Sequence, residues 1–252
     1  MERSRLLQCL AADYLQLRTV ASTGLNAQVP TCPGWTVTDL VRHVGQVYLH
    51  KAEVMHTGAW PDPWPPAETV TEAPIALLDR GYAAVTHAFS RRGDTDRSAT
   101  WHAPDQTVKF WIRRMAQETV IHRLDAELAA HSIEADPVPV DLAIDGIDEV
   151  LRLFLAYHVK SWPEEFTEAF AGVKPCTVRV AVTGPAPAEW LVRIGEGTVT
   201  IDAPAGDGIA DGVVQGGAEE VLRWLWGREL TPLPVEGDAV VVLRRLLAPS
   251  QQ

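Results

Sequence analysis

Apolar residues recur every three to four positions through the first 160 residues, which is the spacing of one face of an α-helix. On this pattern we predict helices at 3–20, 36–56, 72–91, 107–130 and 141–160. Thr36 and Asp39 resemble a capping box at the start of the second helix. Residues 60–66 include four prolines and cannot be helical, because proline lacks the amide donor and clashes with the preceding turn. The pattern therefore predicts an up-down helical bundle.

After Pro163 the period changes to the alternation that is typical of β-strands. Alternating apolar residues predict strands at 177–182, 190–194 and 199–201, with a short helix at 218–227 that Gly227 ends. The segment 240–246 fits a strand or a helix equally well. We therefore expect an α+β protein with a helical bundle at 1–160 and a small α+β domain at 161–252.

Composition limits the partners of this chain. Its 252 residues contain 22 basic and 33 acidic side chains, for a net charge of −11, which argues against nucleic acid or an anionic membrane as partners. No apolar run approaches the ~18 residues of a membrane span, and the charged N-terminal helix does not resemble a signal peptide. Three scattered cysteines argue against a disulfide framework. We expect a cytoplasmic protein, and the sequence leaves its oligomeric state open.

Two of the predicted helices carry ionisable residues on faces that are otherwise apolar. His43 and His50 lie on the inward stripe of 36–56, while Glu118 and His122 lie on that of 107–130. A carboxylate among apolar neighbours costs several kcal/mol unless it is compensated. One compensation is a divalent cation, for which a four-residue spacing supplies two ligands and the facing His43 a third. The alternative is an ion pair of Glu118 with an arginine of its own helix, with the histidines packed in the core.

Three segments resemble the mycothiol-dependent maleylpyruvate isomerase family of the DinB-like superfamily. They are Val29–Gly45 (VPTCPGWTVTDLVRHVG), Trp101–Glu127 (WHAPDQTVKFWIRRMAQETVIHRLDAE) and Leu225–Arg228 (LWGR). The resemblance implies a DinB-like four-helix bundle and a small sterol-carrier-like α+β domain. It also implies a divalent metal, commonly Zn²⁺, on the residues that match the family's ligands: His43, Glu118 and His122.

The resemblance further implies that an arginine of the C-terminal domain acts in catalysis, and Arg228 matches it. Cations also suit the C-terminal end of a helix, so the alternative for Arg228 is a helix cap. We predict Asp125 as a residue that orients a ligand imidazole, with a surface ion pair to Arg123 or Arg42 as the alternative. His50 and Trp101 are candidates for substrate binding, although a histidine at the core or its rim is the more common case.

Three protein ligands would leave coordination positions open for substrate. The resemblance then implies activation of a low-molecular-weight thiol, mycothiol in this family, for attack on an electrophilic small molecule. Addition followed by elimination isomerises a cis double bond like that of maleylpyruvate, whereas addition alone transfers the sulfur. Two other functions use the same residues: oxidative chemistry at Fe²⁺ or another redox metal, and binding of a small molecule without turnover.

Overall fold

The chain divides into two compact units, which a computed structural model describes over residues 1–130, 136–202 and 210–251. The units are Met1–Asp136 and Pro137–Gln252, so the division falls well before the boundary that we expected at residue 160. The segment between these two boundaries carries the fifth predicted helix, which packs within the second unit, against α9. An amphipathic stripe requires an apolar partner, but its period does not identify which partner it finds.

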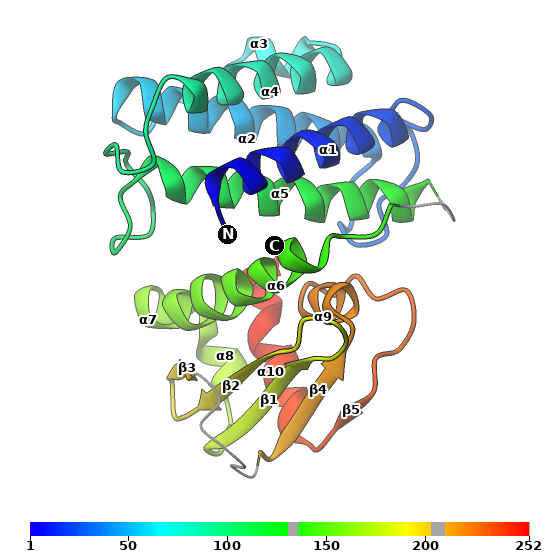
Figure 1. Ribbon diagram of the computed structural model, residues 1–252, viewed down its shortest axis with the longest axis vertical. Helices are drawn as coiled ribbons and strands as arrows, with labels where there is room; N and C mark the ends of the chain where they lie inside the picture. Colours follow the sequence, from blue (N-terminus) through cyan, green and yellow to red (C-terminus); the bar gives the residue numbers. More distant parts are fainter. Residues whose placement is uncertain (131–135, 203–209, 252) are drawn as a thin grey trace. The chain divides into compact units, whose positions relative to one another are not determined.

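Four long helices form the first unit and lie side by side (Figure 1). They are α1 (Arg3–Ala21), α2 (Val37–Thr57), α4 (Pro74–Ser90) and α5 (Val108–Ala129), and the short α3 (Glu68–Thr71) precedes α4. Helix α1 packs on α5, and α2 packs on both α4 and α5. All four predicted bundle helices are therefore present, with ends within about two residues of those expected from the sequence. Helices α2 and α4 run in the same direction, because α3 and its flanking loops lead the chain back along the bundle, so the helices do not alternate strictly as an up-down bundle would.

Helix α2, which carries His43, is fixed at its start by side-chain hydrogen bonds. The Thr36 hydroxyl accepts the Asp39 amide at 3.3 Å, and the Asp39 carboxylate accepts the Thr36 amide at 2.8 Å. This is the predicted capping box. The helix ends at Gly58, whose φ of 76° is the left-handed conformation that favours glycine.

Two glycines let α2 and α4 approach closely. A Cβ atom placed on Gly81 of α4 would lie only 2.4 Å from the carbonyl oxygen of Gly45 on α2. A Cβ on Gly45 would meet the backbone of Leu77 at 3.0 Å. The crossing is therefore a backbone-to-backbone contact, and it fixes α2 two residues beyond His43.

Polar contacts inside the bundle join the other helix pairs. Arg123 of α5 is almost fully buried and forms ion pairs with Asp13 of α1 at 2.8 Å and with Glu127 at 2.6 Å. The Tyr48 hydroxyl of α2 lies 2.5 Å from the Thr119 hydroxyl of α5. Because buried polar groups are costly without partners, these contacts favour one packing of the helices over others.

The second unit is built on a five-stranded mixed sheet of order β3-β2-β1-β4-β5. Its strands are β1 (Cys176–Val182), β2 (Ala188–Ile194), β3 (Val199–Asp202), β4 (Gly212–Gly216) and β5 (Val235–Glu236). Only β1 and β4 run parallel to each other. Val178, Val180 and Val182 are buried on one face of β1, as their alternation predicts. Helices α9 (Ala218–Leu225) and α10 (Ala239–Leu247) pack on β1 and β4.

The remaining elements of this unit lie mainly before the sheet in sequence. They are α6 (Val140–Glu149), the π-helical η1 (Val150–Tyr157), α7 (His158–Ser161), η2 (Pro163–Phe166), α8 (Thr167–Phe170) and, at the C-terminus, η3 (Ala248–Gln251). The π-helical turns of η1 interrupt what the sequence indicated as a single helix. The α+β class is confirmed. None of the described helices combines the length and the apolar character that crossing a bilayer requires.

Candidate metal centre

The residues expected to bind a metal lie together where α2 faces α5. Nitrogen atoms of His43 and His122 and a carboxylate oxygen of Glu118 all lie within 4.8 Å of one another. Oε1 of Glu118 is 3.2 Å from Nε2 of His43 and 3.3 Å from Nε2 of His122. The three ligands predicted from the sequence thus point to one position between the two helices. Among the described residues no other group of three such side chains is arranged in this way.

The cluster is partly open to solvent. The His43 side chain is 38% exposed, against 17% for Glu118 and 12% for His122, so access is mainly from the α2 side. The Trp35 ring, from the loop before α2, packs beside the His43 ring with centroids 5.1 Å apart. His43 is therefore the most solvent-exposed residue of the cluster, and Glu118 and His122 of α5 are the more buried ones.

Asp125 is fully buried and binds the His122 ring at Nδ1, the nitrogen that faces away from Glu118. Its Oδ2 accepts a hydrogen bond from Nδ1 of His122 at 2.9 Å, which leaves Nε2 of that ring facing Glu118. Thr31 donates to the other oxygen of Asp125 at 2.5 Å, and the Cys32 thiol lies 3.8 Å from Oδ2. The Thr-Cys-Pro-Gly-Trp loop therefore contacts the cluster twice, through Asp125 and through Trp35. The surface ion pair that was the alternative for Asp125 is excluded by its burial.

Arg114 supplies the third partner of Glu118. Its guanidinium donates to Oε2 of Glu118 at 2.8 Å, while Oε1 faces the two imidazoles. The ion pair considered above as an alternative to a metal site is therefore present together with the histidine cluster. Arg114 holds one carboxylate oxygen and leaves the other directed into the cluster.

The electrostatics of the cluster favour a cation between its ligands. Burial by itself raises the pKa of Glu118, but His122, His43 and Arg114 outweigh it and hold that pKa well below its usual value. Burial likewise acts to lower the pKa of His122, whereas Glu118 and Asp125 raise it to about 9. A proton on His122 is thus retained because two carboxylates face it. Two imidazole nitrogens and a carboxylate oxygen are also a common zinc ligand set, so these residues fit a divalent metal.

An aromatic cluster follows along the same helix interface. The His50 ring lies 5.4 Å from the Trp60 ring and 4.9 Å from the Trp64 ring, and Trp60 lies 6.2 Å from Trp111 of α5. Burial, with the neighbouring Lys51, lowers the pKa of His50 to about 4, so this imidazole is neutral at pH 7. A role for His50 in substrate binding stays a prediction.

Lys51 is a residue of this region that the sequence analysis missed. Its ammonium lies 4.8 Å from the centre of the Trp111 ring and 5.7 Å from that of Trp60. Lys51 shares helical spacing with the buried Val44, Tyr48 and Met55 of α2, so periodicity could have selected it, but the sequence analysis followed the neighbouring stripe through His43 and His50. A cation on an otherwise apolar stripe, next to His50, was the signal that could have found it.

The two remaining candidates lie away from the ligand cluster in sequence. Trp101 packs on Phe110 and His102, with ring centroids 5.4 Å and 6.3 Å away. Arg228 belongs to the second unit, three residues after the last residue of α9, and its guanidinium donates to the Trp226 carbonyl at 2.6 Å. This contact is the kind that a helix cap makes, and a catalytic role for Arg228 stays a prediction.

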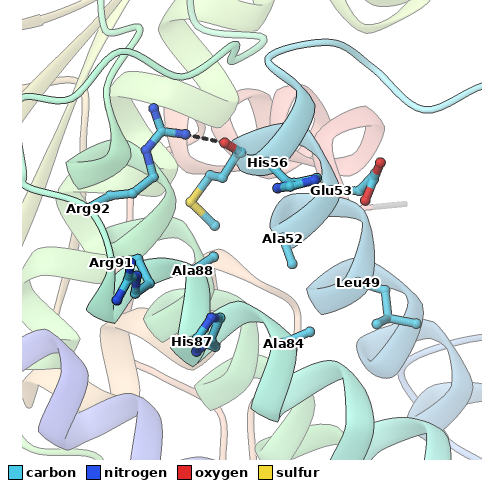
Figure 2. A pocket seen from close by; sticks show the side chains of 10 residues that line it. Leu49, Ala52, Glu53, His56, Ala84, His87, Ala88, Arg91 and Arg92 are labelled. Atoms are coloured by element: carbon cyan, nitrogen blue, oxygen red, sulfur yellow. Dashed lines mark hydrogen bonds between the residues drawn. The ribbon is translucent and has the colours of Figure 1, made fainter.

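A hollow of about 480 Å³ lies elsewhere in the first unit, between the C-terminal halves of α2 and α4 (Figure 2). His56, His87 and Glu53 line it, and Arg92 donates a hydrogen bond to the Met55 carbonyl at its edge. None of the three cluster residues borders this hollow. The hollow and the cluster between α2 and α5 are therefore separate features of the first unit.

The fold and the cluster define a two-part α+β protein whose helical bundle carries a candidate metal centre. The chain belongs to the mycothiol maleylpyruvate isomerase family, which is a family of enzymes. Residues 7–127 match the mycothiol maleylpyruvate isomerase N-terminal domain, and residues 141–244 match the C-terminal domain of the same family. The family recognised from the sequence is therefore confirmed.

Solved structures with the same fold carry the family's name. A crystal structure of the mycothiol-dependent maleylpyruvate isomerase matches with a TM-score of 0.64 and 15% identity, over 94% of this chain and 93% of that one. A histidine-to-alanine mutant of that enzyme matches with a TM-score of 0.61 and 14% identity over the same shares. No curated protein sequence matches the chain.

Proposed function

We propose that this protein is a metal-dependent enzyme that uses a low-molecular-weight thiol, of the mycothiol type, to isomerise or to modify an electrophilic small molecule. The observation that supports it most directly is the convergence of His43, Glu118 and His122 within 4.8 Å in a chain of this family. The solved structures of the same fold are of an enzyme that is mycothiol-dependent and isomerises maleylpyruvate.

His43, Glu118 and His122 are the residues that would hold the metal, with zinc as the expected ion. When bound there, zinc would lower the pKa of a coordinated thiol, so that the thiol is present as thiolate at neutral pH. Glu118 needs only one oxygen for this role, because Arg114 binds the other. Asp125 keeps Nε2 of His122 directed at the cluster through its hydrogen bond to Nδ1.

The proposed reaction begins with attack of the thiolate sulfur on one carbon of a conjugated cis double bond. A carbon–sulfur bond forms, the π electrons move into the neighbouring carbonyl, and the former double bond rotates as a single bond. Expulsion of the sulfur then restores the double bond in the trans form and returns the thiol. In a transfer reaction the adduct is protonated at carbon instead, and the sulfur remains attached.

Metal content and thiol-dependent turnover together test this proposal. Protein purified without chelator or metal-binding tag should contain about one zinc per chain by mass spectrometry. The variants His43→Ala, Glu118→Ala and His122→Ala should lose both the zinc and the mycothiol-dependent isomerisation of maleylpyruvate, with their helical circular dichroism retained.

His56→Ala is the matched control, because His56 is an exposed histidine of the same helix α2 that lies outside the cluster. It should retain both the metal and the activity. Wild-type protein that binds no metal even in excess zinc, or a His122→Ala variant with full metal content, would contradict the proposal. Iron at one atom per chain, with oxygen consumption, would favour oxidative chemistry in its place.

A further inference from the structure

Lys51 is a cation held next to the candidate metal centre by aromatic rings. Its ammonium donates to Nδ1 of the neutral His50 at 3.2 Å and lies over the faces of Trp111 and Trp60. Within the described residues it forms no ion pair, so His50 is the acceptor available for its three N–H groups. A partly buried ammonium is costly without a carboxylate, and cation–π contacts contribute only about 1–2 kcal/mol each.

The position of Lys51 relates it to the metal centre. It lies on α2, eight residues after His43, and it faces Trp111, which lies on α5 seven residues before Glu118. The two helices therefore run antiparallel here. Lys51 and Trp111 lie about 11 Å along the helix axes from His43 and Glu118. Helical side chains as a rule lean towards the N-terminus of their helix, which for Lys51 is the end that carries His43.

The charge of Lys51 is affected by the cluster as well. Burial lowers the pKa of this lysine to about 8, although the Glu118 carboxylate opposes that effect and Arg114 adds to it. Lys51 thus remains mainly protonated at pH 7. It lies close enough to Glu118 to interact with its charge without forming an ion pair with it.

We propose that Lys51 binds the carboxylate of the electrophilic substrate, so that this site acts on acids whose reactive double bond lies between Lys51 and the metal centre. The rings of Trp60 and Trp111, 6.2 Å apart and at 85° to each other, provide aromatic surface next to Lys51 for the conjugated body of such a compound. Trp60 is 47% exposed, in the proline-rich loop, and forms the outer wall of this subsite. The part of this inference that concerns the reaction rests on the proposed function. The binding of a carboxylate by Lys51 does not depend on it.

Calorimetric titration of the full-length protein with unreactive probes tests the assignment directly. The probes are maleate, a planar cis-dicarboxylate, and its neutral diester dimethyl maleate, both without thiol. Wild type should bind maleate, and Lys51→Met should weaken this binding about 10- to 100-fold, the usual effect of losing a charge-assisted hydrogen bond. Lys51→Arg should retain most of the affinity, and the diester should bind alike to all three proteins.

Lys109→Met is the matched control, because it removes the same charge from an exposed position of α5. It should leave maleate binding unchanged. Equal maleate binding by wild type and Lys51→Met, or a wild-type affinity for the diester equal to that for maleate, would overturn the assignment.

Two further arms separate this inference from the proposed function. Titration with N-acetylcysteine and with its neutral amide measures whether Lys51 binds a carboxylate of the thiol instead. If Lys51→Met weakens the binding of N-acetylcysteine but not that of maleate, the assignment to the electrophile is overturned. Zinc content is measured on each protein. If wild type holds no zinc and yet binds maleate through Lys51, the proposed function fails and the assignment of Lys51 stands.

Discussion

The close crossing of α2 and α4 makes Gly81→Ala a sharp test of how the bundle positions His43. The new Cβ would lie 2.4 Å from the Gly45 carbonyl oxygen, and a Cβ essentially never approaches a heavy atom within 3.0 Å. Because the clash is with backbone, no side-chain rotation relieves it and the helices must move apart. Overpacking of this kind costs ~1–3 kcal/mol, and the better helix propensity of alanine returns up to ~1 kcal/mol.

We therefore expect Gly81→Ala to lower the free energy of unfolding by about 1–2 kcal/mol, measured by urea titration followed by circular dichroism. Zinc affinity should fall as well, because Gly45 lies two residues from His43. The control is Ala83→Gly at an exposed position of α4, which measures the propensity effect alone. A Gly81→Ala protein that is as stable as wild type, or more stable, would refute the close crossing as a determinant of helix position.

Three further predictions concern the centre and the second unit. Asp125→Asn should lower zinc affinity by about 10- to 100-fold in a chelator competition, because the His122 ring loses its charged partner. An unchanged affinity would show that Asp125 does not orient the ring. In metal-free protein the pKa of His122 is about 9, above its unfolded value of ~6.5, so His122 stabilises the fold below pH 6.5 and loses that contribution as pH rises. In urea titrations the free energy of unfolding of the wild type should fall by on the order of 2 kcal/mol between pH 6.5 and 8, and that of His122→Asn should not. The same dependence of unfolding free energy on pH in both proteins would contradict the assigned charge of His122. Arg228→Ala should retain zinc and reduce turnover if Arg228 acts in catalysis, and a lower melting temperature with unchanged turnover would identify it as the cap of α9.

The grouping of His43, Glu118 and His122 could be predicted from the sequence because these residues follow helical periodicity. Glu118 and His122 are four residues apart on an otherwise apolar stripe, and His43 lies on the matching stripe of α2. Such a pattern is local in sequence, and the family resemblance adds the same three positions. The orienting contact of Asp125 follows for the same reason, because it is made to a residue three positions away on the same helix.

Features that depend on distant partners were not predictable in this way. Strand β4 is only Gly212–Gly216, flanked by glycines, and it exists because it pairs in parallel with β1. The segment at 240–246 is rich in β-branched residues, yet it forms α10, because its apolar face packs on the sheet. The aromatic partners of Lys51 were not predictable either, since Trp60 comes from a loop and Trp111 from another helix.

The ligand cluster joins residues that are far apart in the chain, and this determines when the site can form. His43 and Glu118 are separated by 75 positions, so no local segment brings them together. An unfolded or partly folded chain offers at most the pair Glu118 and His122 on one helix, a weak chelate. Folding of the bundle, with contacts such as Tyr48–Thr119, would therefore have to precede the binding of a metal by all three residues. On the proposed function, a newly made chain would be inactive until its helices have packed.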